Sequence, residues 1–303
     1  MNAHLDQKHI HGEMSAKVFR EIALIAHREA GLVISESKMA MVKSRITRRL
    51  RALALPDYET YLALVNSPDG AAEMPNFISA LTTNVSHFFR EGHHFDLLKN
   101  TILPPLLKKA ANGGRIRIWS AGCSNGQEPY SIAMTLLSLD PKAFDKDIRI
   151  LATDIDPEVI AHARAGLYPK SMATGLEPEH ISAFFESVQQ NGELCHSALE
   201  PLRKLVSFRR LNLHEKWPMN GKFDVIFCRN VVIYFDEATQ AVLYKNFANA
   251  LGSEGWLLLG HSERITDNVS GIFETAGVTA YRPVGSSKVD SALKPNALMA
   301  KGA

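Results

Sequence analysis

Apolar residues in the first third of the chain recur at three- and four-residue spacing, which is typical of amphipathic helices. The recurring positions are Val18, Phe19, Ile22 and Ile25, then Met39, Val42, Ile46, Leu50 and Leu53, then Tyr61, Leu62 and Val65. Ser15 is the expected N-cap of the first helix, and Pro56-Asp57 and residues 67–70 are typical of turns. The pattern predicts an all-helical domain over residues 15–89, preceded by a flexible N-terminus at 1–14.

Residues 90–114 continue the helical pattern and are expected to form a linker helix. Pro104-Pro105 interrupts this helix, and Asn112-Gly113-Gly114 ends it.

After Gly114 the pattern changes to short apolar strands that alternate with helices, which predicts a parallel sheet covered on both faces. The expected strands are 115–120, 148–153, 206–211, 223–228, 256–259 and 278–281, and the expected helices are 128–139, 157–165 and 236–251. Asp156 is the expected N-cap of the second of these helices, and Gly252 the expected stop of the third. The fold class is therefore α/β, with a doubly wound, mostly parallel sheet over residues 115–284.

Two segments do not fit this alternation. The interval 168–205 is too long for a plain crossover and has its own Gly and Pro turns, so an inserted subdomain is expected there. Residues 285–303 are rich in Ser, Lys and Ala without any period, which predicts a disordered tail.

Composition and charge exclude several classes of protein. The chain has 303 residues, of which 46% are hydrophobic, and a formal net charge of only +2, so it gives no general reason to expect nucleic acid as a partner. No apolar run approaches the ~20 residues of a membrane-spanning helix, and the N-terminus lacks the pattern of a signal peptide. We expect a cytoplasmic monomer without membrane insertion.

Metal and disulfide chemistry are not expected either. Cys123, Cys195 and Cys228 form no CxxC pair, which favours reduced packing residues. His93 and His94 are adjacent, and neighbours on a helix point ~100° apart, so we predict that they bind no metal ion together.

Polar residues at the ends of the strands are the candidate ligand groups, because open parallel sheets bind ligands there. Gly122, Gly126 and Glu128 follow the first strand. Their spacing is not GxGxxG, and the acidic Glu128 favours a cationic ligand such as a sulfonium over a pyrophosphate. Alternatively, the glycines only make a tight turn.

Three further strand ends carry polar side chains: Asp154, Asn212 and Asn230. A carboxylate at the position of Asp154 can accept hydrogen bonds from both hydroxyls of a ribose. The alternative role for Asp154, capping the next helix, is better filled by Asp156. Each Asn alone is more often a turn former than a ligand group.

Five strings in order resemble the CheR family of chemotaxis receptor methyltransferases, from about Ser15 to Arg282. They are TTNVSHFFRE (82–91), CSNGQEPYS (123–131), ATDID (152–156), FCRNVVIYF (227–235) and GHSE (260–263). The resemblance implies the S-adenosylmethionine-dependent methyltransferase fold, with an all-helical N-terminal domain and a small antiparallel β subdomain inserted in the catalytic domain. It also implies transfer of a methyl group from S-adenosylmethionine to glutamate carboxylates of methyl-accepting chemotaxis receptors.

By the same resemblance, cofactor contacts fall on positions along the whole catalytic part. They are Asn84, Ser86, Arg90, Glu128, Asp154, Asn212, Leu213, Asn230 and Val231. Arg90 and Tyr234 are implied near the transferring methyl, as the catalytic pair. Ser86 stands where the family commonly has Thr, and Gln127 replaces a frequent Glu.

One helix of the first domain has a strongly basic face opposite its apolar stripe. We expect Lys43, Arg45, Arg48, Arg49 and Arg51 to bind the acidic cytoplasmic helices of the receptor. The alternatives are an ordinary solvated surface, an RNA substrate for the same basic helix, or a catalytically silent adaptor that binds the cofactor. No interleaving of aromatic and basic residues supports RNA, and the presence of Arg90 and Tyr234 argues against a silent protein.

Overall fold

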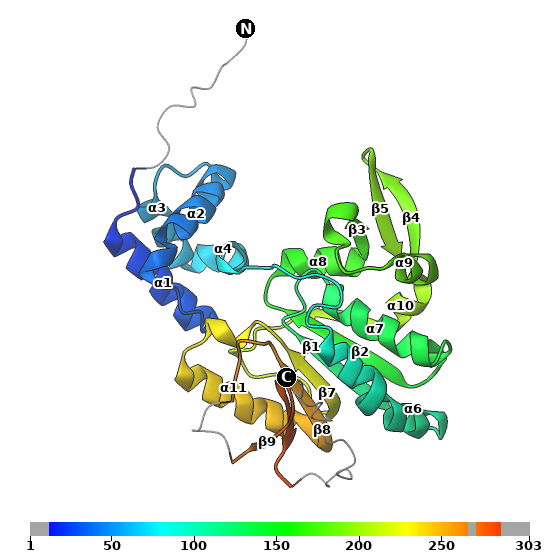
Figure 1. Cartoon of the computed structure of the whole chain (residues 1–303). Helices are drawn as coiled ribbons and strands as arrows, with labels where there is room; N and C mark the ends of the chain where they lie inside the picture. Colours follow the sequence, from blue (N-terminus) through cyan, green and yellow to red (C-terminus); the bar gives the residue numbers. More distant parts are fainter. Residues whose placement is uncertain (1–11, 266–270, 286–303) are drawn as a thin grey trace, which may run out of the picture.

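The computed structural model describes residues 12–265 and 271–285 and shows a helical domain joined to a covered sheet (Figure 1). The expected flexible N-terminus at 1–14 and tail at 285–303 lie, apart from residues 12–14 and 285, outside the described residues. Among the helices that are described, none has the length and apolar character needed to cross a membrane.

The helical domain is built from the predicted amphipathic stripes. Its helices are α1 (Ala16–Ala30), α2 (Met39–Leu53), α3 (Tyr58–Val65) and α4 (Met74–Leu81), with single turns of 3-10 helix at Glu36–Lys38 and Pro68–Ala72. Ser15 caps α1 as predicted, because its Oγ accepts the Val18 N–H at 3.2 Å. Asp57 is also an N-cap, since its Oδ1 accepts the Thr60 N–H at 2.7 Å and so begins α3.

The linker forms α5 (His93–Leu97), a π-helical turn at Leu98–Ile102 and α6 (Leu103–Ala111). The irregularity therefore precedes Pro104-Pro105 rather than coinciding with it. Both prolines stand in the first turn of α6, directly after the π-helical turn, so the chain stays helical through them.

The central sheet has seven strands in the order β6-β2-β1-β7-β8-β10-β9. The strands are β1 (Ile116–Ala121), β2 (Ile148–Asp154), β6 (Val206–Arg210), β7 (Phe223–Cys228), β8 (Leu251–Leu259), β9 (Phe273–Gly277) and β10 (Ala280–Pro283). All neighbouring pairs are parallel except those that involve β10. The predicted doubly wound, mostly parallel sheet is confirmed.

The carboxyl-terminal part of the sheet differs from the prediction in two places. Helix α11 (Glu237–Ala250) runs directly into β8, so Gly252 lies in the strand and does not stop the helix. The single strand expected at 278–281 is a hairpin of β9 and β10, with Val278-Thr279 at its turn. Strand β9 lies at the sheet edge and buries only Phe273, so it lacks the alternation that would reveal a strand.

Side chains alternate between the two faces of the sheet, and each face has its own core. Ile116 and Ile118 of β1 pack in one core with α6 and α7 (Gln127–Leu139). Trp119 and Ala121 pack on the opposite face with α11, in a core that continues into the helical domain. This continuous core holds the helical domain against the sheet.

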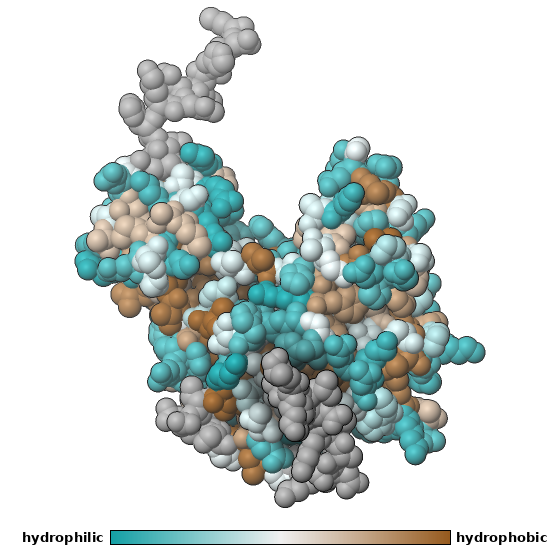
Figure 2. Space-filling view, viewed as in Figure 1, coloured by the Kyte–Doolittle hydropathy of each residue, from teal (hydrophilic) through white to brown (hydrophobic). Residues whose placement is uncertain are grey.

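The interval after α8 (Pro157–Ala165) forms the expected small antiparallel subdomain. Its strands β3 (Leu167–Pro169), β4 (Phe185–Gln190) and β5 (Glu193–Ala198) pair in the order β3-β5-β4, beside α9 (Pro178–Phe184) and α10 (Glu200–Leu205). The molecular surface is hollowed between this subdomain and the helical domain (Figure 2).

Candidate functional site

A cavity of about 270 Å³ lies where the carboxyl ends of the strands meet the helical domain and the segment after α4. It is lined by all ten predicted cofactor and catalytic residues: Asn84, Ser86, Arg90, Glu128, Asp154, Asn212, Leu213, Asn230, Val231 and Tyr234. Residues from five separate stretches of sequence therefore share one cavity.

Asp154 lies buried at the end of β2 with both carboxylate oxygens anchored. Oδ2 accepts the Ser124 N–H at 2.8 Å, and Oδ1 accepts the Asp156 N–H at 3.1 Å. Burial raises the pKa of Asp154 to about 6, against the opposing effect of these N–H groups. Asp156 caps α8 as predicted, so Asp154 is not needed as a helix cap.

The two glycines of the loop after β1 have structural reasons of their own. Gly122 and Gly126 have φ angles of 84° and 91°, which favour glycine. A Cβ on Gly122 would lie 2.3 Å from Val231, and one on Gly126 would lie 2.8 Å from Ala163 and Tyr168. The tight-turn interpretation thus holds for both, although Gly122 also lines the cavity.

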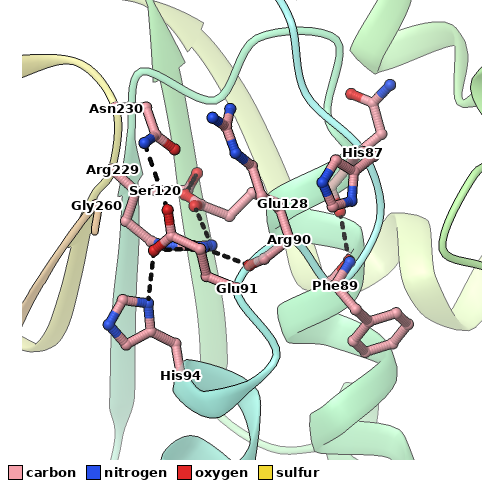
Figure 3. A network of polar contacts seen from close by, with 12 residues as sticks. His87, Phe89, Arg90, Glu91, His94, Ser120, Glu128, Arg229, Asn230 and Gly260 are labelled. Atoms are coloured by element: carbon pink, nitrogen blue, oxygen red, sulfur yellow. Dashed lines mark hydrogen bonds and ion pairs between the residues drawn. The ribbon is translucent and has the colours of Figure 1, made fainter. Parts of the chain in front are cut away.

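Glu128 already has protein partners at the first turn of α7 (Figure 3). Its Oε1 accepts the Ser120 hydroxyl at 2.6 Å, and its Oε2 pairs with Arg229 Nη1 at 3.1 Å. Burial raises the pKa of Glu128, and the Arg229 charge opposes this shift. The negative charge expected to attract a cationic ligand is therefore partly compensated.

Asn212 and Asn230 line the cavity and also shape their loops. The Asn212 amide donates to the Glu29 carbonyl at 2.8 Å, while its oxygen accepts the His214 N–H at 3.0 Å. Asn230 has a φ of 58°, a conformation that Asn tolerates better than most residues. Both the turn-forming role and the position at the cavity are present.

Arg90 and Tyr234, the predicted catalytic pair, line the same cavity from different elements. Arg90 follows α4 and precedes α5, and its Nη1 donates to the Val85 carbonyl at 2.9 Å. Tyr234 ends a 3-10 turn at Val232–Tyr234, directly after the loop that follows β7.

Three charged residues of the site were not predicted: Glu91, Arg229 and Glu263. The Arg229 side chain is only 2% exposed and pairs with Glu91 at 3.2 Å, in addition to Glu128. Glu263 is buried and accepts five backbone N–H groups, those of Asn230, Val231, Val232, Ile233 and Gly260. All three fall within the strings that carry the family resemblance, which was the available signal.

The five basic residues of α2 fall into two groups, one exposed to solvent and one bonded inside the helical domain. Lys43, Arg48 and Arg51 are exposed. Arg45 donates to the carbonyls of Ala80 and Thr82, and Arg49 pairs with Glu73 through Nε at 2.8 Å and Nη2 at 2.7 Å. Arg45 and Arg49 thus hold the helical domain together.

The geometric reason given against a metal ion at His93 and His94 was wrong. Ligand atoms of Glu91, His93 and His94 lie within 4.8 Å of one another. The absence of a metal ion stays a prediction, supported by the guanidinium of Arg229, which compensates Glu91 at 3.2 Å.

Comparison with known proteins matches both parts of the chain to family models. Residues 84–282 match the CheR methyltransferase SAM-binding domain, and residues 17–82 match the CheR methyltransferase all-alpha domain. A probable chemotaxis protein methyltransferase of Rhizobium etli is 46% identical over 84% of this chain and 96% of its own length. The chemotaxis protein methyltransferase of Salmonella typhimurium is 39% identical, over 87% of this chain and 88% of its own.

Proposed function

The chain belongs to the CheR family of chemotaxis methyltransferases, and from this we propose that it methylates glutamate carboxylates on the cytoplasmic helices of chemotaxis receptors. The methyl group would leave the sulfonium for the carboxylate oxygen, so the products would be a glutamate methyl ester and S-adenosylhomocysteine. Methyltransferase activity in chemotaxis and the cofactor S-adenosylmethionine follow from the family itself. The single cavity that gathers all ten predicted residues supports the proposal most strongly.

The residues of the cavity fit the cofactor. Each Asp154 oxygen accepts one backbone N–H, and a carboxylate oxygen has a further acceptor site for a ribose hydroxyl. Asn212 and Leu213 would lie by the adenine, and Glu128 would lie near the charged methionine end. When bound, S-adenosylmethionine supplies a methyl group on a sulfonium, which is already an activated electrophile.

The acceptor requires no general base. A glutamate side chain has a pKa near ~4.3 and is ionised at neutral pH. The protein has only to exclude water and hold the carboxylate at a fixed place and angle. Chemistry of this kind depends on positioning groups rather than on a titrating residue.

We assign the task of holding that carboxylate to Arg90 and Tyr234. Arg90 uses Nη1 to contact the Val85 carbonyl, and a guanidinium carries roughly four further N–H donors in a planar fork. Tyr234 offers a hydroxyl on the wall of the same cavity. We infer that the two side chains orient the incoming carboxylate from two elements.

The exposed residues of α2, Lys43, Arg48 and Arg51, form the proposed docking face for the receptor. Receptor helices that carry several glutamates are acidic, so charge complementarity would speed encounter. Arg45 and Arg49 contribute to this face mainly by holding α2 in place.

The test is to incubate the protein with methyl-labelled S-adenosylmethionine and receptor cytoplasmic fragments, then treat the product with alkali. We expect labelled methanol, since an ester is hydrolysed and a methylated nitrogen is not. Fragments whose acceptor glutamates are replaced by alanine serve as the control and should release none. Label that survives alkali, or label that persists on the control fragments, would contradict the proposal.

A further inference from the structure

The backbone on both sides of Arg90 has an unusual conformation. Phe89 has a φ of 50° and Glu91 a φ of 57°, both in the left-handed region, although neither residue is glycine. Such a conformation is unfavourable for a residue with a Cβ and persists only where surrounding contacts determine it. We call residues 89–91 the Arg90 turn.

Ser131, Arg229 and His261 hold the Arg90 turn to the rest of the site. The Phe89 N–H donates to Ser131 Oγ at 3.0 Å, and Arg229 Nη2 donates to the Arg90 carbonyl. Glu91 Oε1 accepts the backbone N–H of His261 at 3.2 Å and lies 3.0 Å from its ring Nδ1. The turn is therefore fixed by groups from α7, from the loop after β7 and from the loop after β8.

Glu91 also pairs with Arg229, the residue that holds the Arg90 carbonyl (Figure 3). Its Oε2 lies 3.2 Å from Arg229 Nη2, with the two side chains 11% and 2% exposed. Burial alone would raise the pKa of Glu91, but the Arg229 charge and the hydrogen bonds from His261 lower it to about 2. Glu91 is thus an anion that pairs with the guanidinium that holds the Arg90 carbonyl.

The same carboxylate reaches the loop that leads to Tyr234. Asn230 Nδ2 lies 3.4 Å from Glu91 Oε1, and the N–H groups of 230–233 are bound by Glu263. Among the described residues, Arg90, Arg229 and Asn230 line the cavity, whereas Glu91 does not. The Glu91 side chain therefore links the segment that carries Arg90 to the loop that leads to Tyr234, without lining the cavity itself.

We propose that Glu91 is a positioning residue for methyl transfer, which acts through Arg229 and His261 to hold the Arg90 turn. It fixes the direction of the Arg90 guanidinium without touching cofactor or acceptor. This inference rests on the proposed role of Arg90 beside the transferring methyl.

The first test is Glu91→Gln, which keeps the size of the side chain and removes its charge. We expect kcat with saturating receptor fragment to fall by about 10- to 100-fold, because small misplacements of an orienting group can cost that much. The Kd for S-adenosylmethionine, measured by calorimetry, should rise by much less than kcat falls, because Arg90 is only one of the predicted cofactor contacts. Asp96→Asn removes an exposed carboxylate from the neighbouring α5 and should leave both quantities unchanged.

A double-mutant cycle separates positioning from general damage. In an Arg90→Ala background, Glu91→Gln should cause no further loss of kcat, because the group it positions is gone. An equal fold loss in both backgrounds, or a normal kcat for Glu91→Gln alone, would overturn the inference. A wild type without methyl transfer would instead count against the proposed function.

If Glu91→Gln does not fold, the inference can be tested with His261→Ala and with hydrogen exchange of the Arg90 turn. His261 is 65% exposed, so His261→Ala removes one contact of Glu91 with little cost to folding. Hydrogen exchange of the amides of 88–92 should be faster in His261→Ala than in the wild type, with kcat lowered roughly a few-fold. Unchanged exchange and unchanged kcat would show that Glu91 does not hold the turn.

Discussion

The cavity and the basic face of α2 use the same residue types in opposite surroundings. At the cavity, the Arg229 side chain is 2% exposed and lies between two carboxylates that bond to further groups. On α2, Lys43, Arg48 and Arg51 are exposed to solvent.

Buried and exposed charges therefore have different roles. A buried pair with fixed partners holds a defined geometry, and removing one partner is costly because the other charge is left unpaired. Exposed charges are screened by salt and hold little geometry, but they attract an oppositely charged surface. The cavity is thus suited to positioning reactants, and α2 to long-range attraction.

Among the charged residues around the cavity, the largest effect is expected for Glu263→Gln. Glu263 is 3% exposed and accepts five backbone N–H groups. A glutamine has one oxygen acceptor, and its NH₂ cannot accept, so buried N–H groups lose their partner. We expect the free energy of unfolding in urea to fall by about 3 kcal/mol.

The matched control is Glu237→Gln, which neutralises an exposed glutamate in the first turn of α11. Its cost should stay below about 0.5 kcal/mol, as for most surface substitutions. Equal losses for the two variants would mean that the five hydrogen bonds of Glu263 contribute little to stability.

A smaller effect is expected for Asp154→Asn, which keeps the shape of the cavity and removes the charge at the end of β2. The affinity for S-adenosylmethionine should fall about 10- to 100-fold, or ~1.4 to ~2.7 kcal/mol. Calorimetry at roughly neutral pH, where a free aspartate is ionised, measures this directly. An unchanged affinity would remove Asp154 from the cofactor site.

The same carboxylate predicts a pH dependence. Because burial raises the pKa of Asp154 to about 6 in the free protein, the carboxylate is protonated below that pH. A ligand that binds the ionised form must then expel the proton. The affinity of the wild type should be constant well above pH 6, decline as the pH approaches 6, and fall by up to about tenfold per pH unit below it. The fall should be weaker in Asp154→Asn; an identical pH profile would assign it to another group, such as Glu128.

Much of the cavity could be predicted from sequence because position in an α/β sheet follows from local pattern. Asp154 ends β2 and Asn230 lies just after β7, and the carboxyl ends of parallel strands meet at one edge of the sheet. The resemblance supplied Asn84, Ser86, Arg90 and Tyr234, which no strand end would have indicated. The structure brings both groups to one cavity.

What could not be predicted depends on contacts between distant parts of the chain. Nothing near Arg229 indicates that it is buried or that its guanidinium meets the Arg90 carbonyl, 139 residues away in sequence. Arg45 and Arg49 look like their exposed neighbours in sequence, since helical spacing alone does not tell which arginine faces Thr82 or Glu73. Edge strand β9 was missed because it buries one residue.

The smallest effect is expected for the exposed charges of α2. The variant combines Lys43→Glu, Arg48→Glu and Arg51→Glu. Receptor methylation at low salt should slow by about tenfold, because the reversed charges repel an acidic helix. The difference from wild type should shrink at ~0.5 M salt, because dissolved ions then limit the interaction between exposed charges to a few ångströms. Cofactor affinity and stability should be unchanged.

Arg49→Glu tests a basic residue of the same helix that is paired inside the domain instead of exposed. Arg49 and Glu73 form a bidentate pair, and Glu73 also accepts from Tyr61 and Asn76, so a second carboxylate there would repel a buried one. We expect a loss of stability, about 3 kcal/mol, that salt does not restore. If the triple variant instead methylates receptor at the wild-type rate at low salt, the exposed residues of α2 are not the docking face.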